Sequence, residues 1–185
     1  MSGPSRLRLL YLSHLSQPAI DRPIYRAIRQ KPVKRIVELG VGDCRRTLRM
    51  LEVAGIHRPL AEISYAGIDL FETRKPGEGP GLSLKRAFQV LRATGARIRL
   101  IPGDPFAALS GAANLLRATD LLVISADHDP DSLAKAWYFV PRMLHAHSRV
   151  FLAEAMSADG SSRLRQVGPR EINQLVYALR RRRAA

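Results

Sequence analysis

The feature that most constrains the fold is a short apolar run that ends in two closely spaced glycines. Residues 35–48 read RIVELGVGDCRRTL. The apolar residues favour a buried β-strand, and Gly40 and Gly42 permit a sharp turn and the close approach of a ligand. Asp43 can accept hydrogen bonds from the first turn of a helix that follows. The stretch predicts a strand, a turn and a helix, as in nucleotide-type sites, although many buried strands also end in glycine.

Strand-like and helix-like segments alternate along the rest of the chain. Strands are expected at 35–39, 63–70, 97–101, 120–125 and 149–153, and helices at 45–54, 83–94, 106–116 and 132–144. This alternation predicts βαβ units, and therefore an α/β fold with a mostly parallel sheet in a three-layer αβα sandwich. After the fifth strand only a short strand at 163–167 and a helix from about 169 to 180 fit the pattern, which predicts a sheet abbreviated at its C-terminal end.

Length and cysteine content bound the class of protein. The 185 residues suit one domain with a sizeable core, in which residues 1–32 form an N-terminal helical extension and residues 33–185 the ligand-binding domain. Cys44 is the single cysteine, so no internal disulfide is expected, and a small buried residue is favoured there over a reactive thiol. No apolar run suits a signal peptide or a membrane span. A cytoplasmic protein without membrane contact is expected.

The chain is strongly basic, with a formal net charge of +14. Such a charge can attract nucleic acid, and the C-terminal run Arg180–Arg183 is a candidate contact. However, no aromatic residues interleave the basic clusters as a stacking platform would require. Nucleic-acid binding is therefore kept as an alternative.

Polar residues gather where the predicted strands end. In an open parallel sheet the ligand crevice lies outside the carboxyl ends of the strands, so these residues are expected to meet at one edge. The candidates are Glu38, Gly40, Gly42, Asp69, Gly103, Asp104, Ser125, Asp127 and His128. A nicotinamide dinucleotide is disfavoured, because its G-x-G-x-x-G turn needs a third glycine where this chain has Arg45.

Four segments carry a family resemblance. The sequences VELGVG (37–42), GIDL (67–70), IPGDPF (101–106) and ISADH (124–128) resemble successive motifs of the class I S-adenosylmethionine-dependent methyltransferases. The resemblance covers roughly residues 33–154. It implies a Rossmann-like methyltransferase sheet and S-adenosylmethionine as the cofactor, and it does not specify the substrate.

The resemblance also implies roles for the cofactor-binding candidates. Glu38 would lie near the methionine end, directly or through water, and the backbone of Gly40 and Gly42 would lie beneath the cofactor. Asp69 would accept hydrogen bonds from the ribose hydroxyls. The Gly103-Asp104 turn would face the adenine, with Asp104 toward its amino group. The plainer alternatives are an acid that ends a strand for Asp69 and a turn residue for Asp104.

Methyl transfer needs alignment and, for a hydroxyl acceptor, a base. Asp127 and His128 are the catalytic candidates, and a helix-capping acid beside a surface histidine is the alternative. The expected function is methyl transfer to oxygen or nitrogen of a small-molecule acceptor. The alternatives are an RNA methyltransferase or RNA-binding protein, and a methyltransferase-like protein without activity.

The chain departs from the metal-dependent members of this family. They bind a divalent ion through the first acid of the strand-four motif and an acidic pair after strand five, where this chain has Ser125 and the pair Glu154-Ala155. The remaining acids Asp127, Asp129 and Glu154 offer oxygen ligands, but the sequence predicts no metal site. The short C-terminal part leaves a sheet edge open, which a second copy, giving a homodimer, or a helix-rich partner would cover.

Overall fold

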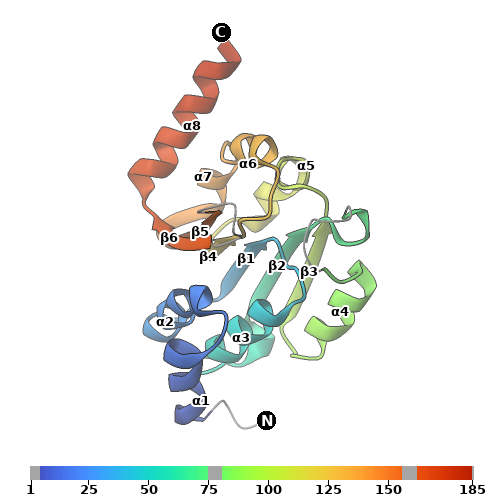
Figure 1. The fold of residues 1–185 in the computed structure, drawn as a ribbon, viewed down its shortest axis with the longest axis vertical. Helices are drawn as coiled ribbons and strands as arrows, with labels where there is room; N and C mark the ends of the chain where they lie inside the picture. Colours follow the sequence, from blue (N-terminus) through green and yellow to red (C-terminus); the bar gives the residue numbers. More distant parts are fainter. Residues whose placement is uncertain (1–4, 75–80, 156–161, 185) are drawn as a thin grey trace.

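The computed structural model describes residues 5–74, 81–155 and 162–184, without the side chains of residues 155 and 180–184. Six strands form one sheet in the order β3-β2-β1-β4-β5-β6 (Figure 1). The strands are β1 (Arg35–Leu39), β2 (Ser64–Asp69), β3 (Arg97–Pro102), β4 (Thr119–Ile124), β5 (Leu144–Ala155) and β6 (Ser162–Val167). Strands β1 to β5 are parallel, and β6 runs antiparallel to β5.

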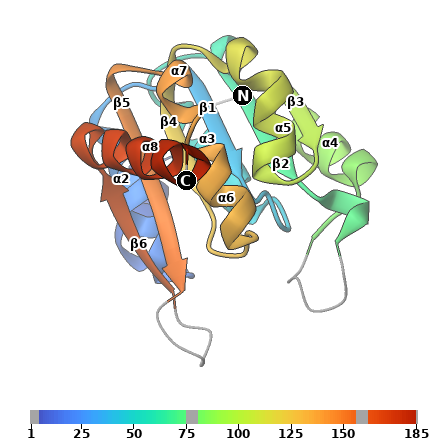
Figure 2. The same cartoon turned by 90° about the horizontal axis from the view of Figure 1, so that it is seen from above.

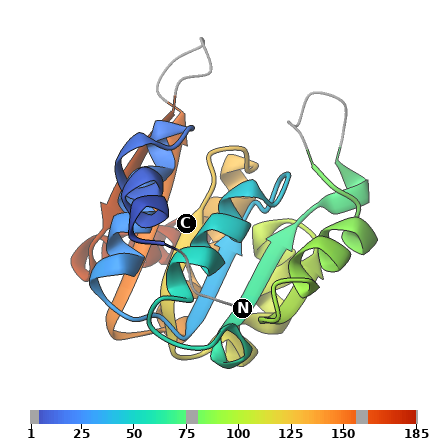
Figure 3. The same cartoon turned by 90° about the horizontal axis from the view of Figure 1, so that it is seen from below.

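Helices cover both faces of the sheet, which confirms the three-layer arrangement (Figures 2 and 3). One face carries α1 (Arg6–Leu10), α2 (Arg22–Gln30), α3 (Arg45–Ala54) and α4 (Leu84–Arg92). The other carries α5 (Pro105–Ala112), α6 (Pro130–Ala136), α7 (Val140–Met143) and α8 (Pro169–Ala184). Short 3-10 or π-helical turns occupy Tyr11–Leu15, Ala19–Asp21, Leu60–Glu62, Phe71–Thr73 and Ala113–Leu116.

Alternation along the central strand supplies two separate hydrophobic cores. Ile36 of β1 packs with α2, α3 and α4, whereas Val37 and Leu39 pack with α5, α6 and α7. Successive side chains of a strand point to opposite faces of the sheet. A strand buried on both faces therefore needs apolar side chains on each, which Ile36, Val37 and Leu39 supply in β1.

The register of the parallel strands brings their carboxyl ends into one line. Leu39 is paired with Ile68 of β2 and with Ile124 of β4. Just beyond these pairs, the backbone N–H of Gly40 donates to the carbonyl of Ile68 at 2.8 Å, and that of Ser125 donates to Leu39 at 2.9 Å. The predicted common edge for the polar strand ends is therefore confirmed. Because the strand order reverses direction at β1, this edge is also the topological switch point where ligands bind in such sheets.

The N-terminal helices belong to the first core. Ile24, Tyr25 and Ile28 of α2 are fully buried against that core. Arg149 of β5 donates from its guanidinium to the carbonyl of Ala27 and, at 3.2 Å, to that of Lys31. The described part of the N-terminal extension is therefore anchored to the strand that precedes the sheet edge.

One expected helix is wrong in its extent. The periodicity of residues 132–144 predicts a single helix, but α6 ends at Ala136 and α7 is a separate turn that ends at Met143. Pro141 lies in the first turn of α7, where its missing N–H does no harm. Leu144, expected to end the helix, begins β5, which is longer than the predicted strand 149–153.

The C-terminal end of the sheet is abbreviated, as expected. Within residues 162–184, β6 is the single strand that follows β5, and α8 then runs to Ala184. The side chains of the candidate run Arg180–Arg183 lie outside the described part of the chain. No helix in the described ranges is both long and apolar enough to cross a membrane.

Candidate functional site

The glycine turn after β1 is held in a conformation that ordinary residues rarely adopt. Gly40 and Gly42 have φ values of +85° and +59°, in the left-handed region that favours glycine. A Cβ on Gly40 would lie 2.6 Å from the Cβ of Ser125 at the end of β4. The N-cap of α3 is Cys44, whose side chain makes no capping bond, and Asp43, one residue earlier, accepts from the N–H of Arg45 at 3.0 Å. The turn therefore brings bare backbone to the end of β4.

Asp69, at the end of β2, accepts hydrogen bonds from this turn. Its Oδ2 accepts from the backbone N–H of Val41 at 2.7 Å and of Gly42 at 2.9 Å, and its Oδ1 accepts from Phe71 at 3.2 Å. Burial acts against the charge of Asp69, but Arg74 and these backbone donors outweigh it and hold the pKa of the carboxyl below its ordinary value. Asp69 is therefore a buried carboxylate that fixes the glycine turn.

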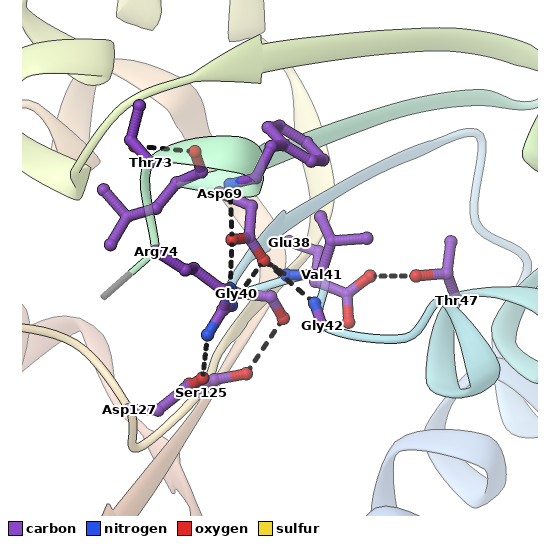
Figure 4. Close-up of polar contacts among 12 residues, drawn as sticks. Glu38, Gly40, Val41, Gly42, Thr47, Asp69, Thr73, Arg74, Ser125 and Asp127 are labelled. Carbon is purple, nitrogen blue, oxygen red and sulfur yellow. Dashed lines mark hydrogen bonds and ion pairs between the residues drawn. The ribbon is translucent and has the colours of Figure 1, made fainter. Parts of the chain in front are cut away.

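Arg74 bridges two carboxylates across the crevice. It donates to Asp69 from Nε at 3.0 Å and from Nη2 at 2.8 Å, and its Nη1 reaches Asp127 Oδ2 at 3.3 Å. Figure 4 shows the side chain running from Asp69 toward Asp127 past Gly40. Only 11% of the Arg74 side chain is exposed. The position where a ligand would cover the glycine turn is thus held by the protein's own cation.

Glu38 belongs to the core and does not line the crevice. It is fully buried, and its oxygens accept from Tyr65 Oη at 2.6 Å, from Arg46 Nε at 2.6 Å and from Thr47 Oγ1. A carboxylate with these partners is satisfied inside the protein. This structure therefore offers no direct contact between Glu38 and a ligand over the turn.

Arg46 links the buried carboxylate of Glu38 to the backbone of the glycine turn. Its Nη2 donates to the carbonyl of Gly40 at 2.8 Å and to Ser125 Oγ. Its pKa is raised, because Glu38 and Asp21 outweigh the effect of burial. The side chain of Arg45, which stands where a dinucleotide-binding turn would have its third glycine, is 80% exposed, whereas that of Arg46 is 17% exposed. The bulky cation beside the glycine turn is therefore Arg46.

Gly103 and Asp104 follow β3 at the same edge. The N–H of Gly103 donates to the carbonyl of Asp69 at 2.9 Å. Asp104 caps α5, because its Oδ1 accepts from the N–H of Phe106 at 3.0 Å and of Ala107 at 3.1 Å, and also from Ser132 Oγ. Burial opposes the charge, but these donors hold the pKa of Asp104 below its ordinary value. No hydrogen bond within the described part of the chain engages its Oδ2.

Asp127 and His128 lie on two sides of the loop after β4. Asp127 faces the crevice and pairs with Arg74. His128 instead lines a cavity of about 480 Å³ between α6, the end of β5 and α8. Its Nε2 is buried and has no hydrogen-bond partner among the described residues. The two candidate catalytic residues are therefore adjacent in sequence, but Asp127 faces the crevice and His128 lines the cavity.

The comparisons with known proteins agree on the architecture. No protein-family model matches the sequence, and no curated protein sequence matches it either. Solved structures do match. A SAM-dependent methyltransferase from Archaeoglobus fulgidus superposes with a TM-score of 0.51 at 13% identity, over 95% of this chain and 74% of that chain. The chain has the fold of the class I S-adenosylmethionine-dependent methyltransferases.

Two further structures carry the same methyltransferase fold. A TehB-like SAM-dependent methyltransferase from Corynebacterium glutamicum matches with a TM-score of 0.50 at 16% identity, over 94% of this chain and 78% of that chain. The CurJ carbon methyltransferase matches with a TM-score of 0.51 at 15% identity, over 86% of this chain. This chain spans 37% of the length of the latter. At these identities the likeness concerns the fold alone.

Sequence reasoning missed the two arginines of this methyltransferase-fold crevice. Arg46 lies four residues beyond the VELGVG segment (37–42), where the sequence argument considers Arg45 alone. Arg74 lies in the loop at 72–81, for which the sequence suggests either a binding loop or a surface insert. Residues 75–80 of that loop lie outside the described part of the chain. The available signal was the placement of an arginine within a few residues of each buried acid, Glu38 and Asp69.

Two other expectations concern cysteine and metal chemistry. Cys44 is fully buried, and burial raises the pKa of its thiol to about 12, which agrees with a small buried residue and not with a reactive thiolate. Within the described ranges no group of three or more histidine, cysteine or acidic side chains is placed to hold a metal ion. Two of the acids that could offer oxygen ligands have other partners. Asp129 caps α6 by accepting from the backbone N–H of Ser132, and Glu154 forms an ion pair with Arg165.

Proposed function

We propose that this protein is an S-adenosylmethionine-dependent methyltransferase that acts on a small-molecule acceptor. The observation that carries the proposal is the pair of carboxylates, Asp69 and Asp127, on either side of one cation above the glycine turn. S-Adenosylmethionine carries a sulfonium cation, so it can replace the Arg74 guanidinium there without leaving two carboxylates unbalanced. One of the structures of similar fold, from Plasmodium falciparum, is a complex with S-adenosyl-L-homocysteine.

The residues fit this cofactor on one condition, which is that Arg74 leaves Asp69. With Arg74 displaced, Asp69 can accept from the ribose hydroxyls while Val41 and Gly42 still hold it. Arg46, anchored by Glu38, presents a guanidinium beside the Gly40 carbonyl, where it suits the carboxylate of the methionine end.

The adenine end would meet the turn after β3. Gly103 brings backbone to the edge, and Asp104 Oδ2 is an acceptor that helix capping does not use. When bound, the cofactor supplies an electrophilic methyl group. The protein supplies alignment and the exclusion of water, which are the main protein contributions to an in-line displacement.

The cavity beside His128 suits a small acceptor. Apart from His128 and Glu154, the residues that line it are apolar, among them Trp137, Leu133 and Leu175. Its volume of about 480 Å³ lies in the range of small-ligand sites. The unpartnered Nε2 of His128 can take a proton from an acceptor hydroxyl. Asp127 faces the crevice that the cofactor would fill, whereas His128 lines the cavity, so His128 is the better candidate for the base.

Thermal unfolding with S-adenosylmethionine, which carries the sulfonium cation that the proposal requires, tests the proposal. A ligand that binds only the folded state raises the melting temperature by mass action. We expect a concentration-dependent rise at millimolar ligand that Asp69→Asn reduces and Glu62→Gln, on the surface, leaves unchanged. No rise for the unaltered protein at millimolar ligand would contradict cofactor binding.

A second candidate function is a methyltransferase-like protein without activity. The observation that favours it is that Asp69, Glu38 and the Gly40 carbonyl already accept hydrogen bonds from arginine side chains of the same chain. On this alternative the variant Arg74→Ala also fails to bind S-adenosylmethionine. Binding by that variant would count against an inert crevice.

A further inference from the structure

A second polar site lies at the opposite edge of the sheet, where the strands begin. Arg35, Ser64 and Arg97 are the first residues of β1, β2 and β3, and they form one row across the sheet, because Arg35 is paired with Ser64 and Ser64 with Arg97. Figure 3 shows these three strands side by side. The small Ser64 thus separates two guanidinium-bearing residues.

The row faces the side of the sheet that α5 covers. Val37 and Ala66, two residues further along β1 and β2, belong to the core beneath α5, and side chains two residues apart in a strand share a face. Arg99 is paired with Ala66 and lies on that face too. Three arginines and a serine therefore share one corner of the sheet.

These arginines are short of anionic partners. Within the described ranges, no side-chain hydrogen bond or ion pair engages the guanidinium of Arg97 or Arg99. Arg35 donates from Nη1 to the carbonyl of Arg117, which fixes the group and leaves its other donors available. The carboxylate of Asp120 is occupied by the backbone N–H groups of Lys34 and Arg35 and by His145.

The corner is hollow. A cavity of about 300 Å³ is lined by Arg35, Arg97, Arg99 and Ser64, with Leu115 and Leu116 from the end of the α5 connection among its apolar walls. No acidic residue lines it. Leu115 is 65% exposed, so the apolar wall extends to the surface. The cavity therefore combines uncompensated positive charge with an apolar flank.

We propose that this cavity binds a small phosphate monoester, with the dianion between Arg35, Arg97 and Arg99 and an apolar body against Leu115. Guanidinium forks suit phosphate oxygens bidentately, and the Ser64 hydroxyl can donate a further hydrogen bond. The volume suits a small molecule. The site lies at the edge of the sheet opposite the crevice and does not depend on its function.

Titration of the ¹⁵N-labelled protein with inorganic phosphate and with phenyl phosphate, at constant ionic strength, tests the proposal. We expect saturable amide shifts at Ser64, Arg97 and Leu115, with phenyl phosphate binding more tightly because its ring meets the apolar wall. The double variant Arg97→Gln/Arg99→Gln should weaken binding by about tenfold or more, since it removes charge-assisted bonds. The control Arg92→Gln, on the exposed side of α4, should not.

Four results would overturn the proposal. They are equal shifts with chloride, shifts confined to Val41 and Gly42 of the crevice, unchanged affinity in the double variant, and tight binding of a short single-stranded RNA, dependent on Arg97 and Arg99, in place of phosphate binding. The last would make this corner part of a nucleic-acid surface. Because Arg97 and Arg99 are exposed, thermal unfolding is expected to show that the variants fold normally.

Discussion

The Arg74 guanidinium forms a two-pronged ion pair with Asp69, from Nε at 3.0 Å and from Nη2 at 2.8 Å. The Nη1 of the same arginine also lies 3.3 Å from Oδ2 of Asp127, a residue of the loop after β4. The loop after β2 is thereby tied to the loop after β4, directly above the glycine turn. The candidate cofactor crevice is thus closed by contacts within the chain.

Removal of this ion pair should measurably destabilise the protein. Asp69 keeps its three backbone donors in Arg74→Ala, so we expect a loss of about 1.5–3 kcal/mol, the range for hydrogen bonds to charged groups. Arg74→Lys should recover little, because an ammonium group cannot make the fork. Urea unfolding measures the change. Arg45→Ala, which removes an exposed pair with Asp43, is the control and should lie within about 0.5 kcal/mol of the parent protein.

The buried carboxylate of Glu38 should matter more to stability. Glu38→Ala leaves Arg46 and Tyr65 without their acceptor inside the protein, and loss of one member of a buried pair costs about 3–5 kcal/mol. Glu38→Gln keeps the shape and should cost less. The matched surface variant Glu62→Ala loses only a 3.9 Å pair with Arg58 and should cost at most about 1 kcal/mol. Equal losses for Glu38→Ala and Glu62→Ala would refute the structural role of Glu38.

The pKa of Asp69 predicts a pH dependence of stability. Its carboxyl has a lower pKa in the folded protein than in the unfolded chain, where about 3.9 is usual. The resulting stabilisation is complete above the unfolded value and is lost as the pH falls through the folded value. The stability difference between the parent protein and Asp69→Asn should therefore shrink on acidification from pH 6 to about pH 3. A constant difference over that range would contradict the lowered pKa of Asp69 in the folded protein.

Two glycines give a matched test of the turn. Gly40→Ala meets both a positive φ and Ser125 at 2.6 Å, so we expect a loss of about 2 kcal/mol or more from strain and overpacking. A Cβ at Gly111 in α5 meets nothing within 4 Å, and Gly111→Ala should be neutral or stabilising by up to about 1 kcal/mol. Thermal unfolding measures both. Similar effects would show that the turn is not constrained.

Much of the fold follows from local patterns. The strand at 35–39 and the helix at 45–54 match β1 and α3, because apolar runs, glycines and caps act over a few residues. The periodicity does not predict the break between α6 and α7, because apolar residues continue at helical spacing through Trp137 and Val140, while Pro141 lies in the first turn of a new helix. Periodicity reports which face is buried and does not report whether one helix or two present it.

The candidate site was predictable in its location and not in its contacts. Parallel strands place Asp69, Asp104 and Asp127 at one edge whatever their side chains do. The positions of Arg46 and Arg74 depend on acids that lie 8 and 5 residues away along the chain and on the loop conformations between them. Such pairings are set by the tertiary structure, so a local pattern cannot choose between Arg45 and Arg46.

The central claim is that Arg74 holds the place of a cationic cofactor. Isothermal titration of S-adenosylmethionine into the parent protein, Arg74→Ala and the control Arg45→Ala tests it most directly. We predict that Arg74→Ala binds about tenfold more tightly than the parent protein, because it need not break the pair with Asp69, a difference of about 1.4 kcal/mol. Arg45→Ala should bind like the parent protein. Absence of binding by all three proteins, or weaker binding by Arg74→Ala, would contradict the claim.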